Sequence, residues 1–211
     1  MLKLSPILLA VAYGLVMYMA SAWRLKRELD ARSVELADPR LARVLAPMAE
    51  VLGVARIPVY LYQIAPVNGL AAPDGRIFLT QGFYDRFRKG EVSAEELASV
   101  VAHELGHVAL GHARRRMIDF SGQNAIRAAS AMLIARVLPG AALAVAGLLT
   151  TLLAARLSRQ DEYEADAWAA ALLTRSGIGT QPQKALLAKL ETLTGAAGQP
   201  PAWFLSHPKS A

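Results

Sequence analysis

A His-Glu-x-x-His motif at 103–107 lies inside an apolar, helix-forming run at 97–110. On a helix, residues i and i+4 lie on one face, so the imidazoles of His103 and His107 can reach a single ion. Glu104, next to the first histidine, can act as general base for a hydrolytic water. The motif therefore predicts a helix that carries the zinc site of a hydrolase.

A second acidic segment further along the chain offers the remaining ligand. Glu162 and Asp166 are four residues apart and share a helical face, whereas Glu164 is predicted to project from another face. A carboxylate can complete a three-ligand zinc site, and a second carboxylate one turn on can accept the remaining ring N–H of a ligand histidine. Taken alone, the same segment is typical of an acidic, solvated helix start.

The composition favours a membrane-associated protein over a nucleic-acid binder. Hydrophobic residues make up 54% of the 211 residues, and the net charge is +6. Such a basic chain is a candidate for nucleic-acid binding, but its basic residues cluster beside apolar segments, at 24–27 and 114–116, which favours anionic lipid headgroups. No motif that reads RNA or DNA and no Gly-rich phosphate loop occurs, so neither nucleic acid nor ATP is an expected partner.

The amino-terminal segment predicts a membrane anchor. Residues 4–23 form about one bilayer thickness of apolar helix without an internal charge. We predict an uncleaved transmembrane helix over 1–24 and one domain over 25–211. A cleavable signal peptide is the alternative, because 20–22 (Ala-Ser-Ala) resembles a cleavage site. More basic residues follow the apolar segment than precede it, which predicts a cytoplasmic domain at the inner or plasma membrane.

Helix signals flank a predicted small sheet. Residues 25–37 can continue as a charged helix, and the Asp-Pro pair at 38–39 predicts the cap and first position of another, which stops at Gly53. The Ser-Ala-Glu-Glu run at 93–96 is a capping box, so the metal helix should begin there and run to about Ala113.

Two strand-like segments lie between these helices, at 57–62 and 76–80. Turn signals at 68–69 (Asn-Gly) and 74–75 (Asp-Gly) separate them. The resulting sheet either only covers the metal helix or pairs one edge with an extended substrate by strand addition.

His112 follows the motif closely but lies off the face shared by His103 and His107. The prediction for His112 is a polar contact near the end of the helix, outside the ligand set.

A second hydrophobic stretch, 125–157, separates the two halves of the site. The metal motif precedes it and Glu162 follows it, so any membrane crossings between them must be even in number. Leu-Pro-Gly at 138–140 predicts a break that folds the stretch into a helical hairpin. A hairpin that is buried or lies at the membrane surface is favoured over two true spans. The uninterrupted apolar segment of the first half, between Arg127 and Arg136, is too short to cross a bilayer.

The paired motifs resemble the HtpX/OMA-type membrane zinc metallopeptidases, which are gluzincins related to the CAAX prenyl proteases. The resemblance rests on H-E-L-G-H at 103–107 and S-R-x-x-E-x-x-A-D at 158–166, and it covers roughly 34–208. The run at 68–80 resembles the family's edge-strand segment. His112 matches a histidine common in the family, and Ser-His-Pro at 206–208 resembles a motif near the family's carboxyl end.

This resemblance implies a mainly α fold with a small β-sheet (α+β), as in a gluzincin-type metallopeptidase domain. It implies one Zn²⁺ per chain and assigns these site residues: His103, His107 and Glu162 as ligands, Glu104 as general base, Asp166 beside a ligand, and His207 near the oxyanion. It assigns the substrate edge strand to Arg76, Ile77, Phe78, Leu79 and Thr80. The implied activity is a zinc-dependent endopeptidase that acts on unfolded or damaged membrane-proximal polypeptides.

Two alternatives remain open from the residues alone. One is a membrane-bound holdase or adaptor with a structural zinc, in which the apolar hairpin binds the client. The other concerns His207, which could ligate zinc directly and give a latent, self-blocked protease, or could belong to a mobile tail.

Overall fold

The computed structural model describes residues 5–112, 115 and 142–194 and confirms a mostly helical fold with a small mixed sheet. The described helices are α1 (Ser5–Arg32), α2 (Pro39–Val51), α3 (Gln81–Arg88), α4 (Ala94–Ala109), α6 (Ala142–Arg175) and α7 (Gln181–Thr194). The described strands are β1 (Ser33–Glu35), β2 (Val59–Tyr62), β3 (Gly69–Ala71) and β4 (Ile77–Thr80).

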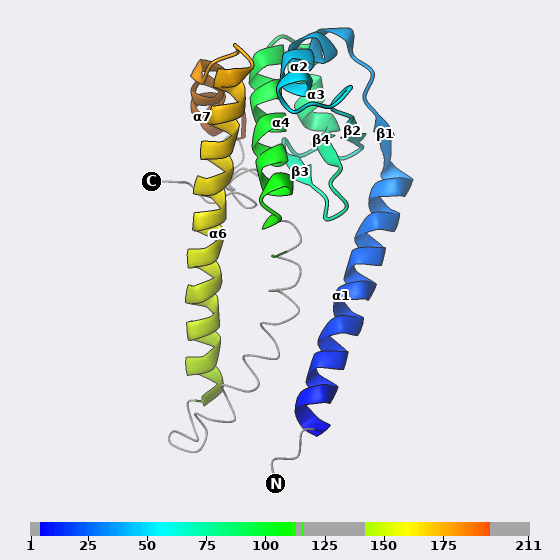
Figure 1. The fold of residues 1–211 in the computed structure, drawn as a ribbon, viewed down its shortest axis with the longest axis vertical. Helices are drawn as coiled ribbons and strands as arrows, with labels where there is room; N and C mark the ends of the chain where they lie inside the picture. Colours follow the sequence, from blue (N-terminus) through cyan, green and yellow to red (C-terminus); the bar gives the residue numbers. More distant parts are fainter. Residues whose placement is uncertain (1–4, 113–114, 116–141, 195–211) are drawn as a thin grey trace.

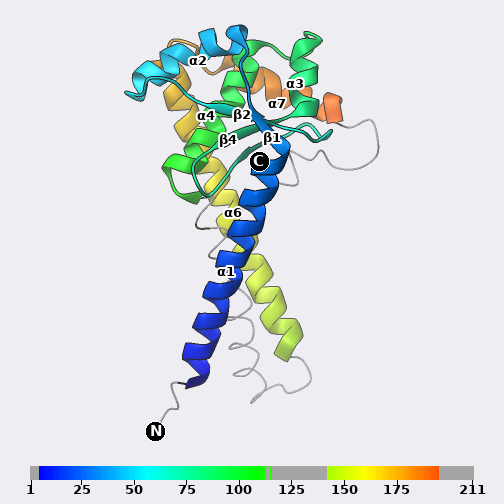
Figure 2. The same ribbon diagram turned by 90° about the vertical axis from the view of Figure 1, so that its right-hand side faces the viewer.

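Two long helices extend from one side of the body that holds the sheet. In Figure 1 the first part of α6 and nearly all of α1 run downward from this body, and Figure 2 shows the same arrangement from the side. Helix α4 lies between them at the level of the sheet, beside the second half of α6. The second half of α6, which packs on α4, contains the acidic segment at 161–166.

The strand order is β1-β2-β4-β3, which corrects one prediction. β4 pairs in parallel with β2 and antiparallel with β3, so 76–80 lies inside the sheet and cannot be a substrate edge. Among the described strands the free edges are β1 and β3. All four residues of β4 are buried, as expected for a strand covered on both faces.

The two faces of the sheet pack against different helices. Ile77 and Leu79 of β4 join the main core with α2, α4 and the second half of α6. Phe78 points the other way and packs with Tyr62 and with Leu29 near the end of α1. Arg76 also binds α1 there, through a 2.8 Å ion pair with Asp30, so it ties α1 to the sheet.

Three predicted boundaries are wrong for local reasons. The charged helix ends at Arg32 rather than at 37, because 33–35 pair with β2 as strand β1. The expected turn at Asn68-Gly69 is instead the point where β3 begins. The Thr80 hydroxyl accepts a hydrogen bond from the Asn68 backbone N–H and donates one to the Asn68 carbonyl. Helix α4 ends at Ala109 rather than at Ala113, because Gly111 adopts a positive φ of 71° that stops the helix.

Among the helices of the described part of the chain, none has the length and apolar character that a membrane crossing requires. The first half of the predicted hairpin over 125–157, including its break at 138–140, lies outside the described residues. The second half, from Ala142 on, is continuous helix in α6.

The predicted cap of α2 is confirmed, and Asp38 does more than cap. Its carboxylate accepts bonds from the backbone N–H groups of Arg40 and Leu41 and from the hydroxyl of Tyr84 on α3. The Arg40 side chain contributes most to lowering the pKa of Asp38 to about 2, and the backbone and Tyr84 bonds add to it against the opposing effect of burial.

Replacement of Asp38 by alanine should lower the free energy of unfolding by about 1–3 kcal/mol, because the cap and the Tyr84 bond are lost together. Asp38→Asn keeps an acceptor and should cost about 1 kcal/mol or less at pH 7. Since the folded pKa is depressed, the carboxylate's stabilisation is present above its ordinary pKa and is lost as the pH falls from about 3.8 to about 2. Urea unfolding of the three proteins at pH 7 and pH 3 measures both effects, and a difference between the aspartate and asparagine proteins that persists unchanged at low pH would contradict the charge-based part.

Candidate metal centre

Helix α4 begins with the predicted capping box and positions the motif. The Ser93 hydroxyl accepts from the Glu96 backbone N–H, and the Glu96 carboxylate accepts from the Ser93 N–H. Lys189 of α7 pairs with Glu96 at 2.7 Å, which attaches α7 to this end of α4. The motif lies on the buried face two to three turns later, where His103, Glu104 and His107 are only 1–5% exposed.

The acidic segment lies in the middle of α6, not at a helix start as its composition alone suggested. Glu162 is only 2% exposed, so a solvated acidic helix face does not describe it. The close approach of α4 and α6 depends on Gly106: a Cβ at that position would lie 3.0 Å from the Ala165 carbonyl oxygen. The glycine of the motif thus lets Glu162 reach the two histidines.

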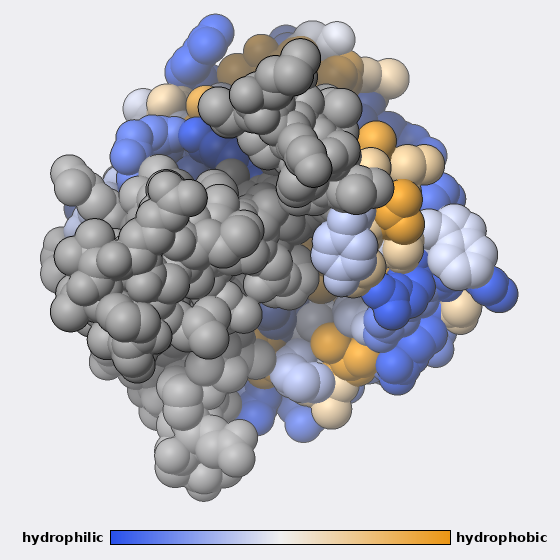
Figure 3. Space-filling view, turned by 90° about the horizontal axis from the view of Figure 1, so that it is seen from below, coloured by the Kyte–Doolittle hydropathy of each residue, from blue (hydrophilic) through white to orange (hydrophobic). Residues whose placement is uncertain are grey.

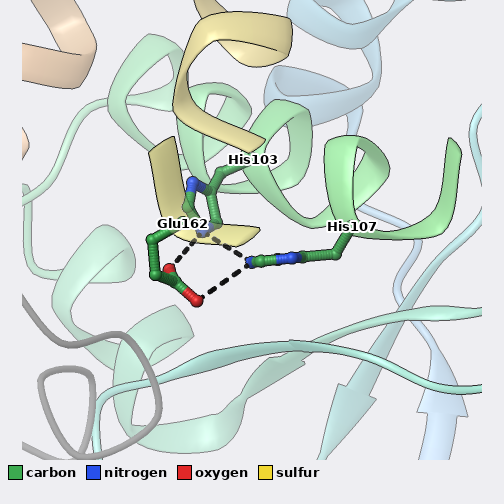
Figure 4. Close-up of side chains that lie close together, drawn as sticks. All are labelled: His103, His107 and Glu162. Atoms are coloured by element: carbon green, nitrogen blue, oxygen red, sulfur yellow. Dashed lines mark hydrogen bonds and ion pairs between the residues drawn. The ribbon is translucent and has the colours of Figure 1, made fainter. Parts of the chain in front are cut away.

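Three side chains from these two helices converge with their donor atoms facing one another (Figure 4). The Nε2 atoms of His103 and His107 are 3.0 Å apart, and the Glu162 carboxylate oxygens lie 3.3 Å from the first and 3.6 Å from the second. A tetrahedral zinc with ligand distances of about 2.0–2.1 Å separates its donors by about 3.3 Å. The donor set and its spacing therefore fit one zinc ion.

A carboxylate orients the first histidine. Asp166 lies 2.8 Å from the Nδ1 of His103, as its position one turn after Glu162 predicted, and Gln183 of α7 donates to the same carboxylate at 3.2 Å. Burial opposes the charged form of His103, but the Asp166 and Glu162 carboxylates outweigh it and raise the pKa of His103 to about 10. For His107 burial dominates, and its pKa is lowered although Glu162 and Glu104 act in the opposite direction. The centre thus attracts a cation at His103, whether a proton or a metal.

His112 contacts the second histidine, which confirms the predicted polar contact outside the ligand set and identifies its partner. Its Nδ1 lies 2.9 Å from the Nδ1 of His107, and its Nε2 lies 3.1 Å from the Glu164 carboxylate. His112 is fully buried, and Arg115 pairs at 3.0 Å with the buried carboxylate of Asp161. The hydrogen bond from Gln160, and next that from His112, lower the pKa of Glu164. Glu164, which was predicted to project from another face than Glu162, therefore presents a charged carboxylate to His112.

An open cleft reaches the centre beside His107. It has a volume of about 470 Å³ and lies between the β3–β4 turn (72–75) and the last turn of α4. A larger cavity of about 620 Å³ lies between α2, β1 and β2 and contains none of the metal-centre residues. His207 lies outside the described residues, so its predicted role stays a prediction.

The model of peptidase family M48 matches residues 35–211, about five sixths of the chain. The chain belongs to peptidase family M48. It is 32% identical over 193 residues to metalloprotease LoiP and 30% identical over 181 residues to metalloprotease YcaL, both of Escherichia coli strain K12. It is also 32% identical over 151 residues to the beta-barrel assembly-enhancing protease of Escherichia coli O157:H7.

These M48 relatives differ in how much of their length corresponds to this chain. The match covers 88% of this chain and 73% of LoiP, and 81% of this chain and 65% of YcaL. It covers 67% of this chain but only 30% of the beta-barrel assembly-enhancing protease. The family membership confirms the resemblance and makes this chain a member of a family of metallopeptidases.

Replacement of Gly106 by alanine should weaken metal binding more than it changes stability. Alanine gains about 1 kcal/mol of helix propensity, but the crowded contact with Ala165 costs about 1–3 kcal/mol. These terms partly cancel in the melting temperature, whereas a shift of α6 by a few tenths of an ångström displaces Glu162 directly. Thermal unfolding and zinc affinity measured on the same samples separate the two effects; a more stable variant with unchanged zinc affinity would show that α6 yields without moving Glu162.

Proposed function

We propose that the protein is a zinc-dependent endopeptidase that is held at a membrane and cleaves unfolded or damaged membrane-proximal polypeptides. The observation that carries the proposal is the buried group of His103, His107 and Glu162 with Glu104 beside it on α4. Membership of a peptidase family supports hydrolysis over the holdase or adaptor alternative.

In this proposal His103, His107 and Glu162 hold the ion, and Glu104 moves protons. A bound Zn²⁺ supplies Lewis-acid polarisation of the scissile carbonyl and favours deprotonation of the attacking water. Glu104 takes the proton from the water and later delivers it to the leaving amine nitrogen. Asp166 holds the ring of His103 through its Nδ1, which keeps the Nε2 lone pair directed at the ion.

An extended substrate would lie along β3 and in the cleft beside His107. β3 is the free sheet edge that packs beside α4, and strand addition there recognises backbone rather than sequence. The adjoining cleft of about 470 Å³ can accept one side chain of the substrate. The proposed substrate edge is thus β3, in place of 76–80, which lies inside the sheet.

The test is cleavage of an unfolded model protein by the full chain in detergent, zinc-loaded or stripped with a chelator. Cleavage within the polypeptide that disappears on stripping and returns with one equivalent of zinc supports a zinc endopeptidase. Release of terminal residues alone would contradict the endopeptidase assignment. A zinc-loaded chain that binds but never cuts the model protein would favour the holdase alternative.

The membrane part of the proposal rests on α1. Its apolar residues Tyr13, Leu15, Val16, Met19 and Trp23 are all more than half exposed, and the basic cluster at 24–27 follows. Seen from the end toward which α1 and α6 extend, apolar and strongly hydrophilic side chains lie next to each other on the described surface (Figure 3). The exposed apolar side chains of α1, with basic residues directly after them, suit a helix that anchors the chain in a membrane and ends at anionic headgroups.

The chain has no cysteine, so the location and side of the domain can be tested with one introduced thiol. Lys89→Cys places this thiol at an exposed site after α3. We expect a membrane fraction that resists alkaline extraction, and a thiol that an impermeant maleimide labels only after the cells are permeabilised. Labelling in intact cells would place the domain outside, and loss from the membrane in alkali would contradict the anchor.

A further inference from the structure

We propose that His112 is a positioning residue of the metal centre. It accepts a hydrogen bond from the Nδ1–H of His107 and donates its own Nε2–H to Glu164, so that Glu164 and His112 together fix the orientation of the His107 ring. The proposal rests on the proposed zinc site and extends it to His112, which lies outside both metal motifs, and to Glu164, a position that the second motif leaves unspecified. His107, His112 and Glu164 form a continuous chain with heavy-atom distances of 2.9 Å and 3.1 Å.

The direction of each bond follows from the ligand atom. The Nε2 of His107 faces His103 and Glu162, so its lone pair must be available there and the ring proton sits on Nδ1. Two ring nitrogens 2.9 Å apart share one proton, so the Nδ1 of His112 is the acceptor. Neutral His112 then carries its own proton on Nε2 and donates it to the Glu164 carboxylate at 3.1 Å.

Burial makes this arrangement specific. His112 is fully buried and His107 is 3% exposed, so water is poorly placed to substitute for either partner. The centre then holds its two histidines by different means. His103 contacts a carboxylate directly, whereas His107 reaches Glu164 through a second imidazole.

His112 and Glu164, together with Asp161, could also be taken for a second metal site. The proton assignment argues against that, because a histidine that accepts at Nδ1 presents N–H, not a lone pair, at Nε2. Arg115 also places its guanidinium 3.0 Å from Asp161 and 4.0 Å from Glu164, where a second cation would be repelled.

Two substitutions of His112 separate positioning from packing. His112→Phe keeps the ring but has no acceptor, whereas His112→Asn fills the site less well but places a carbonyl oxygen near the position of Nδ1. We expect His112→Phe to weaken zinc binding by about 10–100-fold and His112→Asn to remain within about threefold of wild type. A role in packing alone predicts the opposite order.

Zinc affinity is measured by chelator competition on the full chain in detergent, and the visible spectrum of the cobalt-loaded proteins reports the ligand geometry. Glu164→Leu and Glu164→Gln provide a second pair at a partly exposed position, should the His112 variants not fold; leucine should weaken zinc binding by about 3–10-fold and glutamine by less.

Wild type that binds no zinc would refute the proposed function itself. Wild-type affinity in His112→Phe, or in Glu164→Leu if that pair is used, would overturn only the positioning role. Two zinc ions per wild-type chain and one in His112→Phe would also overturn it, in favour of a second metal site.

Discussion

The Glu104→Gln protein is expected to bind zinc like wild type and to cleave an unfolded substrate about 10²–10⁴-fold more slowly, the range that general-base catalysis contributes. Glutamine has nearly the same shape as glutamate, so the buried site around residue 104 can retain its packing. It cannot take up the proton that the attacking water loses. Single-turnover cleavage in detergent measures the rate, and metal analysis of the same samples confirms equal loading.

Glu95→Gln is the matched control, because it makes the same change of charge on the same helix at an exposed position. Its loss should be limited to the weak interaction of Glu95 with the helix dipole, so its cleavage rate should stay close to wild type. A Glu104→Gln protein that keeps more than a tenth of the wild-type rate at equal zinc would remove the proton-transfer role from Glu104.

The sequence predicts best the features that depend on neighbours in the chain. The capping box at 93–96, the cap at Asp38 and the end of α2 at Gly53 are all present, because each is set by hydrogen bonds or backbone angles within four residues. The convergence of His103 and His107 is equally local, since residues one helical turn apart must share a face.

The order of the strands was not predictable in the same way, because it depends on pairing between distant segments. One signal was nevertheless present. Ile77, Phe78 and Leu79 are consecutive apolar residues without alternation, a pattern typical of a strand covered on both faces rather than of an edge. Gly69–Ala71 is short and weakly apolar, so its own residues did not predict strand β3, although it lies within the run at 68–80 that resembles the family's edge-strand segment.

Around the metal centre, too, contacts set by neighbours in the chain could be predicted, whereas contacts between distant segments could not. Asp166 could be placed beside a ligand histidine once Glu162 was assigned, because the two acids share a face of α6, and the structure identifies this histidine as His103. His112 could not be placed by projecting a straight helix, because Gly111 turns the chain and brings His112 back under His107. Gln183 reaches Asp166 from α7, and no sequence pattern indicated it.

Replacement of Glu162 by glutamine should weaken zinc binding more than about 100-fold, because a ligand loss exceeds the 10–100-fold that an outer partner costs. The amide keeps the shape of the side chain but removes the charge that faces both histidines. Asp166→Asn is the matched control on the same helix: it removes one charge from a group that touches His103 but not the ion, so its loss should fall within the smaller range. Equal losses in the two variants would contradict the assignment of Glu162 as the ligand.

The pH dependence of zinc affinity in wild type and in Glu162→Gln tests why the loss of this carboxylate weakens zinc binding. Zinc must displace the proton that the zinc-free protein holds on His103, whose pKa is raised to about 10 by Asp166 and Glu162 against the effect of burial. The apparent zinc affinity of wild type should therefore rise by about tenfold per pH unit between pH 7 and pH 9, whereas a histidine with its ordinary pKa of about 6.5 would give little change there. Glu162→Gln removes one of the carboxylates that hold this proton, so its affinity should be lower at every pH but less steep. A flat wild-type profile in this range would mean that His103 is already neutral before zinc arrives, and the two carboxylates would then act on the metal alone.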